Sequence, residues 1–322
     1  MTQWGVVATI KARPVDVLNF VAYHLEQGAA HIFVYLDQRT PRAQEILRHH
    51  PKVTIRHTDG AYWRTLHGRK PPKHQGRQTV NATHAYRLAT EMGLDWICHI
   101  DVDEFLCPDN SVEAALEATP HAHPGLRLRP AEALASDGQE DLDPSATYCK
   151  AWMENGAGYD RRAVEMDLYP KFGGYLRGGF VSHHVGKLFL RTGLGDVSFR
   201  IHRGFLEGEE IAPIKVSPEM PICHRHIMSW RHLQRTLEFR MDKGSYRAEL
   251  KPSRKSDAGG MSLYEMFSFL QETGGKQALR DFFEEMCLAR EDLRHKLEAY
   301  GLLRTYHLDL ETKRKRQFPD FE

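Results

Sequence analysis

The chain has 322 residues, of which 41% are hydrophobic and 27% are charged, so it has enough apolar side chains for a folded core. Lysine and arginine (44 residues) nearly balance aspartate and glutamate (43 residues), which excludes a protein that binds nucleic acid or anionic membranes through its overall charge. An anionic ligand must therefore be held by a local basic site.

The cysteines and the apolar runs indicate the cellular compartment that we expect for the chain. The five cysteines are scattered and form no CxxC pair, which favours free thiols in a reducing cytosol over a zinc or redox site. No segment approaches the roughly 20 apolar residues of a membrane helix, and no basic flank precedes the short apolar run at the N-terminus. We therefore expect a soluble, cytoplasmic protein without a membrane span.

The N-terminal third of the chain alternates between strand-like and helix-like segments. The strand-like segments are residues 6–10, 31–36, 52–57 and 96–100, and the helix-like segments are residues 14–27, 42–49 and 79–92. Residues 60–76 are basic and contain glycine and proline, which predicts a loop. The β–α alternation predicts a parallel sheet with helices on its faces.

The pattern changes after residue 110. A short strand is expected at residues 126–129, followed by a polar stretch at 136–144 and a glycine-rich region at 156–195. From about residue 230 onward the apolar spacing is typical of helices. We therefore divide the chain into residues 1–110, 111–230 and 231–322.

Acidic side chains follow three of the predicted strands: Asp37, Asp59 and the group Asp101 to Glu104. Ligands of open α/β sheets bind beyond the carboxyl ends of the strands, so these side chains should share one edge. Asp101 and Asp103 are separated by one residue and can face the same way, which suits a hard cation such as Mg²⁺ or Mn²⁺. A DxD pair alone is a weak signal, since acidic residues commonly follow strands in turns.

The residues around this pair resemble a known family. HIDVDEFL (residues 99–106) is similar to the "lDvDEFl" strand of bacterial family-two-like glycosyltransferases, which share the GT-A fold. Residues 10–37 resemble the opening of that family, residues 74–86 resemble the start of one of its helices, and HRHIMSW (residues 224–230) resembles a later segment.

The resemblance implies a Rossmann-like, mixed and mainly parallel sheet flanked by helices, with a C-terminal helical region. Residues 1–110 would be the nucleotide-sugar-binding half, residues 111–230 the acceptor-side half of the same GT-A domain, and residues 231–322 the helical region. The implied activity is metal-dependent transfer of a sugar from a UDP- or GDP-sugar to a glycan, lipid-linked or other hydroxyl acceptor.

Roles for individual residues follow from the same resemblance. Asp103 would ligate Mn²⁺ or Mg²⁺ directly, and Asp101 would complete the metal site through a metal-bound water or reach the nucleotide ribose. Asp37 would contact the ribose or base. Where the family usually has Asn-Glu after its first lysine, this chain has Ala12 and Arg13, which alters the pattern of donor contacts.

A histidine that follows the acceptor region often completes the metal site of GT-A enzymes. This points to His226 as a third metal ligand, with His224 and His202 as rivals. Packing or capping at the start of the following helix explains His226 equally well. The many histidines also suit structural zinc, but they lack a clear third ligand.

Three polar residues are further candidates for binding the nucleotide-sugar. Lys11 ends the first strand, where it either contacts the diphosphate or base of the donor or is exposed and uninvolved. Gln78 and Asn81 are expected at the beginning of a helix, whose free N–H groups favour a diphosphate. Simple helix capping explains these two residues equally well.

An inverting transfer needs a carboxylate base near the acceptor hydroxyl. Asp137, in the polar stretch, is our candidate, and the alternatives left open are Glu132, Glu140, Asp141 and Asp196. A retaining enzyme would need no such base. The basic residues of the glycine-rich segment, Arg177, Lys187 and Arg191, could meet phosphates or an acidic acceptor, although a hairpin with exposed charges explains them nearly as well.

Two other functions fit parts of the pattern. In a haloacid-dehalogenase-like phosphatase an apolar strand also ends in DxD, and Asp101 would then be a nucleophile that becomes phosphorylated. That nucleophile normally ends the first strand, however, whereas DVDEF follows three strands here. A non-catalytic protein that binds a sugar-nucleotide or glycan on the same fold is the second alternative, because fold does not settle function.

Overall fold

The computed structural model describes residues 1–154, 158 and 160–321. The chain forms two compact units: the first comprises residues 1–129, 185–222 and 308–322, and the second comprises residues 130–184 and 223–307. The chain leaves the first unit and returns to it twice. The boundaries of the two units therefore differ from those of the three sequence segments, 1–110, 111–230 and 231–322.

The first unit contains a mixed sheet. Strands β1 (Trp4–Ile10), β2 (His31–Leu36), β3 (Val53–His57) and β4 (Trp96–His99) are parallel and lie in the order β4-β1-β2-β3. β8 (Lys187–Arg191) pairs antiparallel with β4, and the first half of β6 (Gly125–Ala133) pairs antiparallel with β8. β5 (Glu104–Leu106) pairs with β12 (Ile214–His224), and a small separate sheet contains β9 (Val197–Phe199), β10 (Gly204–Leu206) and β11 (Glu209–Glu210).

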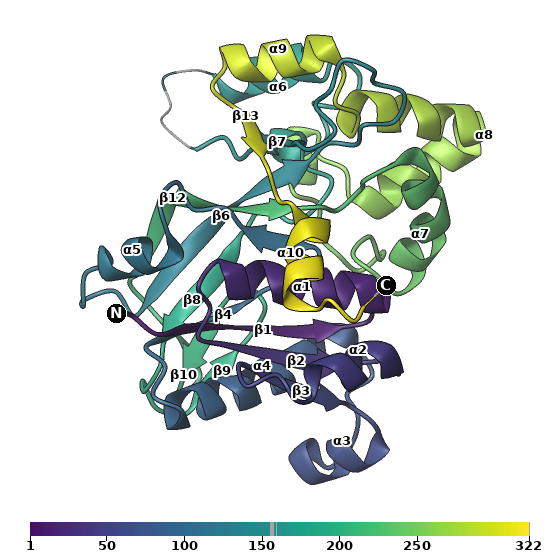
Figure 1. Cartoon of the computed structure of the whole chain (residues 1–322). Coiled ribbons are helices and arrows are strands. Elements are labelled where there is room, and N and C mark those ends of the chain that lie inside the picture. The colour runs from purple at the N-terminus through teal and green to yellow at the C-terminus, as the bar shows by residue number, and fades with distance from the viewer. Residues whose placement is uncertain (155–157, 159, 322) are drawn as a thin grey trace. The chain divides into compact units, whose positions relative to one another are not determined.

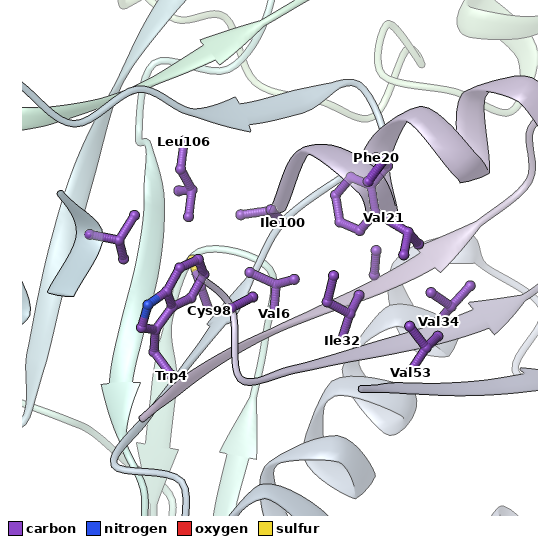
Figure 2. Close-up of a cluster of buried hydrophobic side chains, with 14 of the residues drawn as sticks. Trp4, Val6, Phe20, Val21, Ile32, Val34, Val53, Cys98, Ile100 and Leu106 are labelled. Carbon is purple, nitrogen blue, oxygen red and sulfur yellow. The ribbon is translucent and has the colours of Figure 1, made fainter. Parts of the chain in front are cut away.

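Helices cover both faces of the parallel strands (Figure 1). Alternate residues of β1 point to opposite faces, so Val6 packs in the cluster that contains Phe20 of α1 (Pro14–Glu26), whereas Val7 packs in the cluster that contains Ala85 of α4 (His74–Glu91). Figure 2 shows Phe20 and Val21 of α1 over the strand residues Ile32 and Val34, with Val6 and Cys98 farther along the same cluster. The remaining helices of this unit are α2 (Pro41–Leu47), α3 (Gly60–His67), α5 (Val112–Glu117) and α10 (Leu310–Gln317). The predicted α/β class, a mixed and mainly parallel sheet flanked by helices, is confirmed.

Two local predictions for this unit were wrong. Residues 60–67 form α3 instead of a loop, because Asp59 caps the helix by accepting the N–H of Tyr62 at 2.9 Å and Trp63 provides a buried anchor. α4 begins at His74, five residues before the predicted start. Gln78 and Asn81 therefore lie beyond the first turn, and their backbone N–H groups are not the free ones of a helix end.

The second unit combines a few strands with most of the C-terminal helices. β7 (Thr147–Ala151) pairs antiparallel with the end of β6 and with β13 (Leu303–Tyr306). The helices are α6 (Arg161–Leu168), α7 (Trp230–Asp242), α8 (Leu263–Met286) and α9 (Glu291–Ala299), with short 3₁₀ turns at Arg177–Gly179 and Ser256–Ala258. Their apolar faces form one core that includes Phe267, Phe282 and Phe283. The helical character expected after residue 230 is confirmed for α7 to α9.

The cysteines share one kind of environment. All five are free thiols, and all are buried. Among the helices of the described residues, none is both long and apolar enough to cross a membrane.

The packing of α1 on the parallel strands should dominate the stability of the first unit. Phe20 is fully buried, so replacing it with alanine should lower the free energy of unfolding by about 3–5 kcal/mol, through lost apolar burial and the cavity left behind. Met92, with 50% of its surface exposed, is the control, and Met92→Ala should change the free energy by less than about 0.5 kcal/mol. Urea unfolding followed by circular dichroism measures both, and equal effects would contradict this packing.

Candidate functional site

The carboxyl ends of the parallel strands bring the acidic candidates of the first unit to one edge of the sheet. Asp37 directly follows β2, and Asp101 follows β4 by two residues. β1 lies between these two strands, in register with β2 at Ile10 and Leu36 and with β4 at Val7 and His99. Asp37 and Asp101 therefore flank the end of β1 at the same edge, as predicted.

A buried lysine holds the acidic turn. Lys187, on β8, places its Nζ 2.5 Å from Oδ2 of Asp101 and 2.9 Å from Oε2 of Glu104. The same Glu104 oxygen accepts the backbone N–H of Asp101 at 2.8 Å, and the Glu104 N–H donates to the Asp101 carbonyl at 3.1 Å. Residues 101–104 thus form a closed turn around one ammonium group.

The carboxylates of this turn outnumber the ammonium group that holds it. Lys187 and Glu104 are both 0% exposed, whereas the Asp101 side chain is 30% exposed. Burial opposes the charged form of Lys187, but the neighbouring carboxylates of Asp101 and Glu104 outweigh it and raise the pKa of the lysine. Two carboxylates, those of Asp101 and Glu104, thus contact one ammonium group, and Asp103 lies between them in the chain.

Two consecutive residues of α4 connect the acidic strand ends. The Arg77 guanidinium donates from Nε to Oδ2 of Asp37 at 2.7 Å, and the Gln78 amide donates to Oδ1 of Asp101 at 2.6 Å. Gln78 is 5% exposed, so this amide reaches Asp101 from within the helix–sheet interface. α4 therefore fixes the spacing between the two carboxylates.

Asp37 is surrounded by cations. Lys70 lies 3.1 Å from its Oδ1, while His74 and Arg77 lie 3.3 and 2.7 Å from its Oδ2. Burial raises the pKa of Asp37, but the hydrogen bond from His74 and the charges of Arg77 and Lys70 outweigh burial and lower the pKa to about 2. The Asp37 side chain is only 2% exposed, so the surface above it is formed by the basic residues.

Asn81 and Lys11 differ in their surroundings. Asn81 is fully buried, accepts the Tyr62 hydroxyl at 2.7 Å and donates to the Thr9 hydroxyl at 3.0 Å, so it joins α3 and β1 to α4. A contact between Asn81 and a nucleotide would require one of these bonds to be exchanged. Lys11 is exposed immediately after β1. Asp103 is half-buried in the turn that follows Asp101.

His226 belongs to the second unit, where it is buried. Its Nε2 lies 2.7 Å from the Tyr246 hydroxyl and 2.9 Å from the Arg240 guanidinium. Burial and the charge of Arg240 lower the pKa of His226 well below its ordinary value, so the ring is neutral. Arginine can only donate, so Nε2 accepts and the proton of the neutral ring is on Nδ1. Binding a metal therefore requires this proton or the Arg240 bond to be given up.

The rival histidines are placed differently. The ring of His224 lies 5.0 Å from that of His226 and 5.0 Å from that of His183, within the second unit. His202 belongs to the first unit, and its Nδ1 lies 2.7 Å from the Gly186 carbonyl. Of the three candidates, His224 and His226 share one cluster and His202 does not.

The carboxylates considered as a general base are also in defined positions. Asp137 is half-buried and its Oδ2 accepts the N–H of Trp230 at 3.2 Å, at the start of α7. Glu132 is 3% exposed, forms an ion pair with Lys150 at 3.0 Å, and accepts the N–H groups of Val181 and Ser182. Glu132 is thus part of the buried framework of the second unit.

Sequence reasoning named Lys187 as a residue that could meet phosphates or an acidic acceptor, but it missed the pairing of this lysine with Asp101 and Glu104. The alternative of a hairpin with exposed charges does not hold for Lys187, which is fully buried on a central strand. The run KLFLR, which lacks polar alternation, is the signal of a strand covered on both faces. Lys70, His74 and Arg77 were also missed as partners of Asp37, because only the folded chain brings them together.

Comparisons with known proteins find a family match that covers most of the residues described above for the first unit. Residues 10–124 match the model of glycosyltransferase family 92, and this match supports a glycosyltransferase of the GT-A type. No curated protein sequence matches the chain. Among solved structures, S. aureus TarS residues 1–349 in complex with UDP-GlcNAc is similar, with 12% identity over 98% of this chain and 90% of that one and a TM-score of 0.37. HddC from Yersinia pseudotuberculosis shows 11% identity over 74% and 99% of the two chains, with a TM-score of 0.34.

The cations around Asp37 make a pH-dependent contribution to stability. Since the folded pKa of about 2 lies below the ordinary value of 3.8, the contribution is fully present above that ordinary value and is lost as the pH falls toward 2. At about pH 7 the free energy of unfolding should therefore be larger for the wild-type protein than for Asp37→Asn. This difference between the two proteins should shrink between about pH 4 and pH 3. Urea titrations across this range measure it, and a difference independent of pH would contradict the ionised Asp37.

Proposed function

We propose that the chain is a glycosyltransferase that binds a UDP- or GDP-sugar at the carboxyl edge of β1, β2 and β4 and uses a divalent cation at Asp103. The observation that carries the proposal is the closed acidic turn at the end of β4, inside the segment that matches glycosyltransferase family 92. Five of the other candidates in the first unit also lie within residues 10–124: Lys11, Asp37, Gln78, Asn81 and Asp101.

The chemistry of the turn fits a hard divalent cation. Its donors are carboxylate oxygens, which Mg²⁺ and Mn²⁺ prefer. Both oxygens of Asp101 accept hydrogen bonds, from Gln78 and Lys187, and we propose Asp103 as the direct ligand. When bound, the ion would stabilise the negative charge that develops on the leaving nucleoside diphosphate.

The chain's own residues supply the rest of the donor site. The basic surface of Lys70, His74 and Arg77 suits the negative charge of a nucleoside diphosphate. Gln78 orients Asp101, which we propose to contact a metal-bound water or the ribose. We propose Asp137 as the base that accepts the proton of the acceptor hydroxyl if the transfer inverts the sugar configuration.

An assay with purified protein tests the proposal. UDP- and GDP-sugars are incubated with and without Mn²⁺, and release of nucleoside diphosphate is measured beside a panel of phosphomonoesters. We expect metal-dependent hydrolysis of at least one nucleotide-sugar, because water can replace the acceptor hydroxyl in a slow transfer. Release of phosphate from monoesters instead would support the phosphatase alternative, and binding without turnover would support the non-catalytic one.

The metal site should depend on Asp103. Asp103→Ala should lower turnover by about a hundredfold or more while changing the thermal midpoint by only a few degrees, because a half-buried carboxylate in a turn contributes little to the core. Asp109→Ala, at an exposed position after β5, is the matched control and should keep wild-type turnover. Near-normal turnover of Asp103→Ala in the presence of EDTA would overturn the metal role.

His226 remains our candidate for a third ligand. His226→Gln should weaken Mn²⁺-dependent donor binding more than His224→Gln, because we propose that only the first residue ligates the ion. The two histidines are 6% and 4% exposed, so the thermal midpoints of the two variants are compared first. Equal or reversed effects on donor affinity, measured by isothermal titration calorimetry, would show that His226 is not the ligand.

A further inference from the structure

We propose that Lys187 is a positioning residue of this site: its ammonium group fixes the Asp101 carboxylate, so that a divalent cation binds at Asp103 and not between the two aspartates. This inference rests on the proposed function. It concerns a residue of β8, far in sequence from the acidic turn and outside the residues that match the family model.

The position of Lys187 excludes a direct contact with substrate. The residue is 0% exposed, so its ammonium cannot reach a diphosphate in solvent. A lysine this deeply buried keeps its charge only with carboxylate partners, and both partners belong to the acidic turn. Lys187 therefore acts on any ligand through Asp101 and Glu104.

The contacts also determine what Asp101 can do. Its Oδ2 lies 2.5 Å from the ammonium and its Oδ1 accepts from Gln78 at 2.6 Å. A divalent cation ligated by Asp101 would lie close to a positive charge that cannot move away. Repulsion between the two cations favours the ion at the next carboxylate of the turn, Asp103.

A purely structural role is the competing explanation. Glu104 alone could balance Lys187 and join β8 to the turn, with Asp101 as a bystander. The shorter of the two ion pairs is the one with Asp101, however, and Asp101 is the partner that is partly exposed. An experiment must therefore distinguish two effects of Lys187: the effect of its charge on Asp101 and its contribution to the stability of the fold.

The comparison is between Glu104→Gln and the double variant Lys187→Met with Glu104→Gln. The double variant removes the buried ammonium together with its buried partner, so neither is left uncompensated in the interior. In both variants, the amide introduced at position 104 retains an oxygen to accept the Asp101 N–H. Each protein is characterised by its thermal midpoint, by Mn²⁺ affinity without donor using electron paramagnetic resonance, and by kcat and KM for the nucleotide-sugar.

We expect similar thermal midpoints for the two variants. Relative to Glu104→Gln, the double variant should bind Mn²⁺ about threefold more tightly or better, because a positive charge beside Asp101 has been removed. Its kcat should nevertheless fall about tenfold or more with a smaller change in KM, because the ion and Asp101 are then misplaced. Unchanged Mn²⁺ affinity and kcat would show that Lys187 is only structural.

A second measurement applies even if the double variant does not fold. In the otherwise wild-type chain, Asp103→Asn should weaken Mn²⁺ binding about tenfold or more, whereas Asp101→Asn should weaken it less than about threefold. Equal losses would overturn the inference. The Mn²⁺ titrations need no donor, so the expected pattern without turnover of any nucleotide-sugar would contradict the proposed function alone.

Discussion

The acidic edge of the sheet depends on one ammonium group that has no access to solvent. Moving a lysine and a glutamate out of water costs several kcal/mol for each ion, and only short contacts with good geometry recover this cost. Lys187 meets Asp101 and Glu104 at 2.5 and 2.9 Å, and the Glu104 oxygen also accepts a backbone N–H of the same turn. The turn is consequently held from inside the protein, so a ligand on its outer side need not supply that support.

The second unit uses the same physical arrangement at another loop. Lys150 is 1% exposed and pairs with Glu132, while it also donates to the carbonyls of Gly179 and Met286. Glu132 in turn accepts two backbone N–H groups within the glycine-rich segment. In each unit a buried lysine and a buried glutamate fix the main chain of an irregular segment. Apolar packing cannot do this, because backbone N–H and C=O groups need polar partners.

Much of the first unit was predictable because it follows local rules. Val6 and Val7 lie in a mostly apolar run that is typical of a strand covered on both faces, and Pro14 and Gly28 delimit α1. The acidic strand ends followed from the parallel order of the strands. The start of α4 and the existence of α3 did not, because glycine and proline in residues 60–76 outweighed the capping Asp59 in the sequence reading.

The partners of the acidic residues lay beyond what local patterns contain. Lys187 is 86 residues from Asp101 in the chain, and nothing in a run such as KLFLR distinguishes a lysine that faces water from one that faces a buried carboxylate. Only the antiparallel pairing of β8 with β4 brings the two together. The three residues that pair with Asp37 are likewise brought to it by the tertiary fold. No local sequence motif identifies them.

The surroundings of Asp37 bear on the kind of ligand that this edge accepts. A carboxylate that binds ribose hydroxyls must offer an accessible oxygen, but Asp37 is 2% exposed and its oxygens face Lys70, His74 and Arg77. The Lys70 side chain is 48% exposed, so an approaching ligand meets its positive charge before it meets the carboxylate. Lys70 and Arg77 together carry more positive charge than the single negative charge of Asp37 balances. Under the proposed function, the end of β2 therefore suits the phosphates of a donor better than its ribose, and Asp37 would gather the basic side chains that bind them.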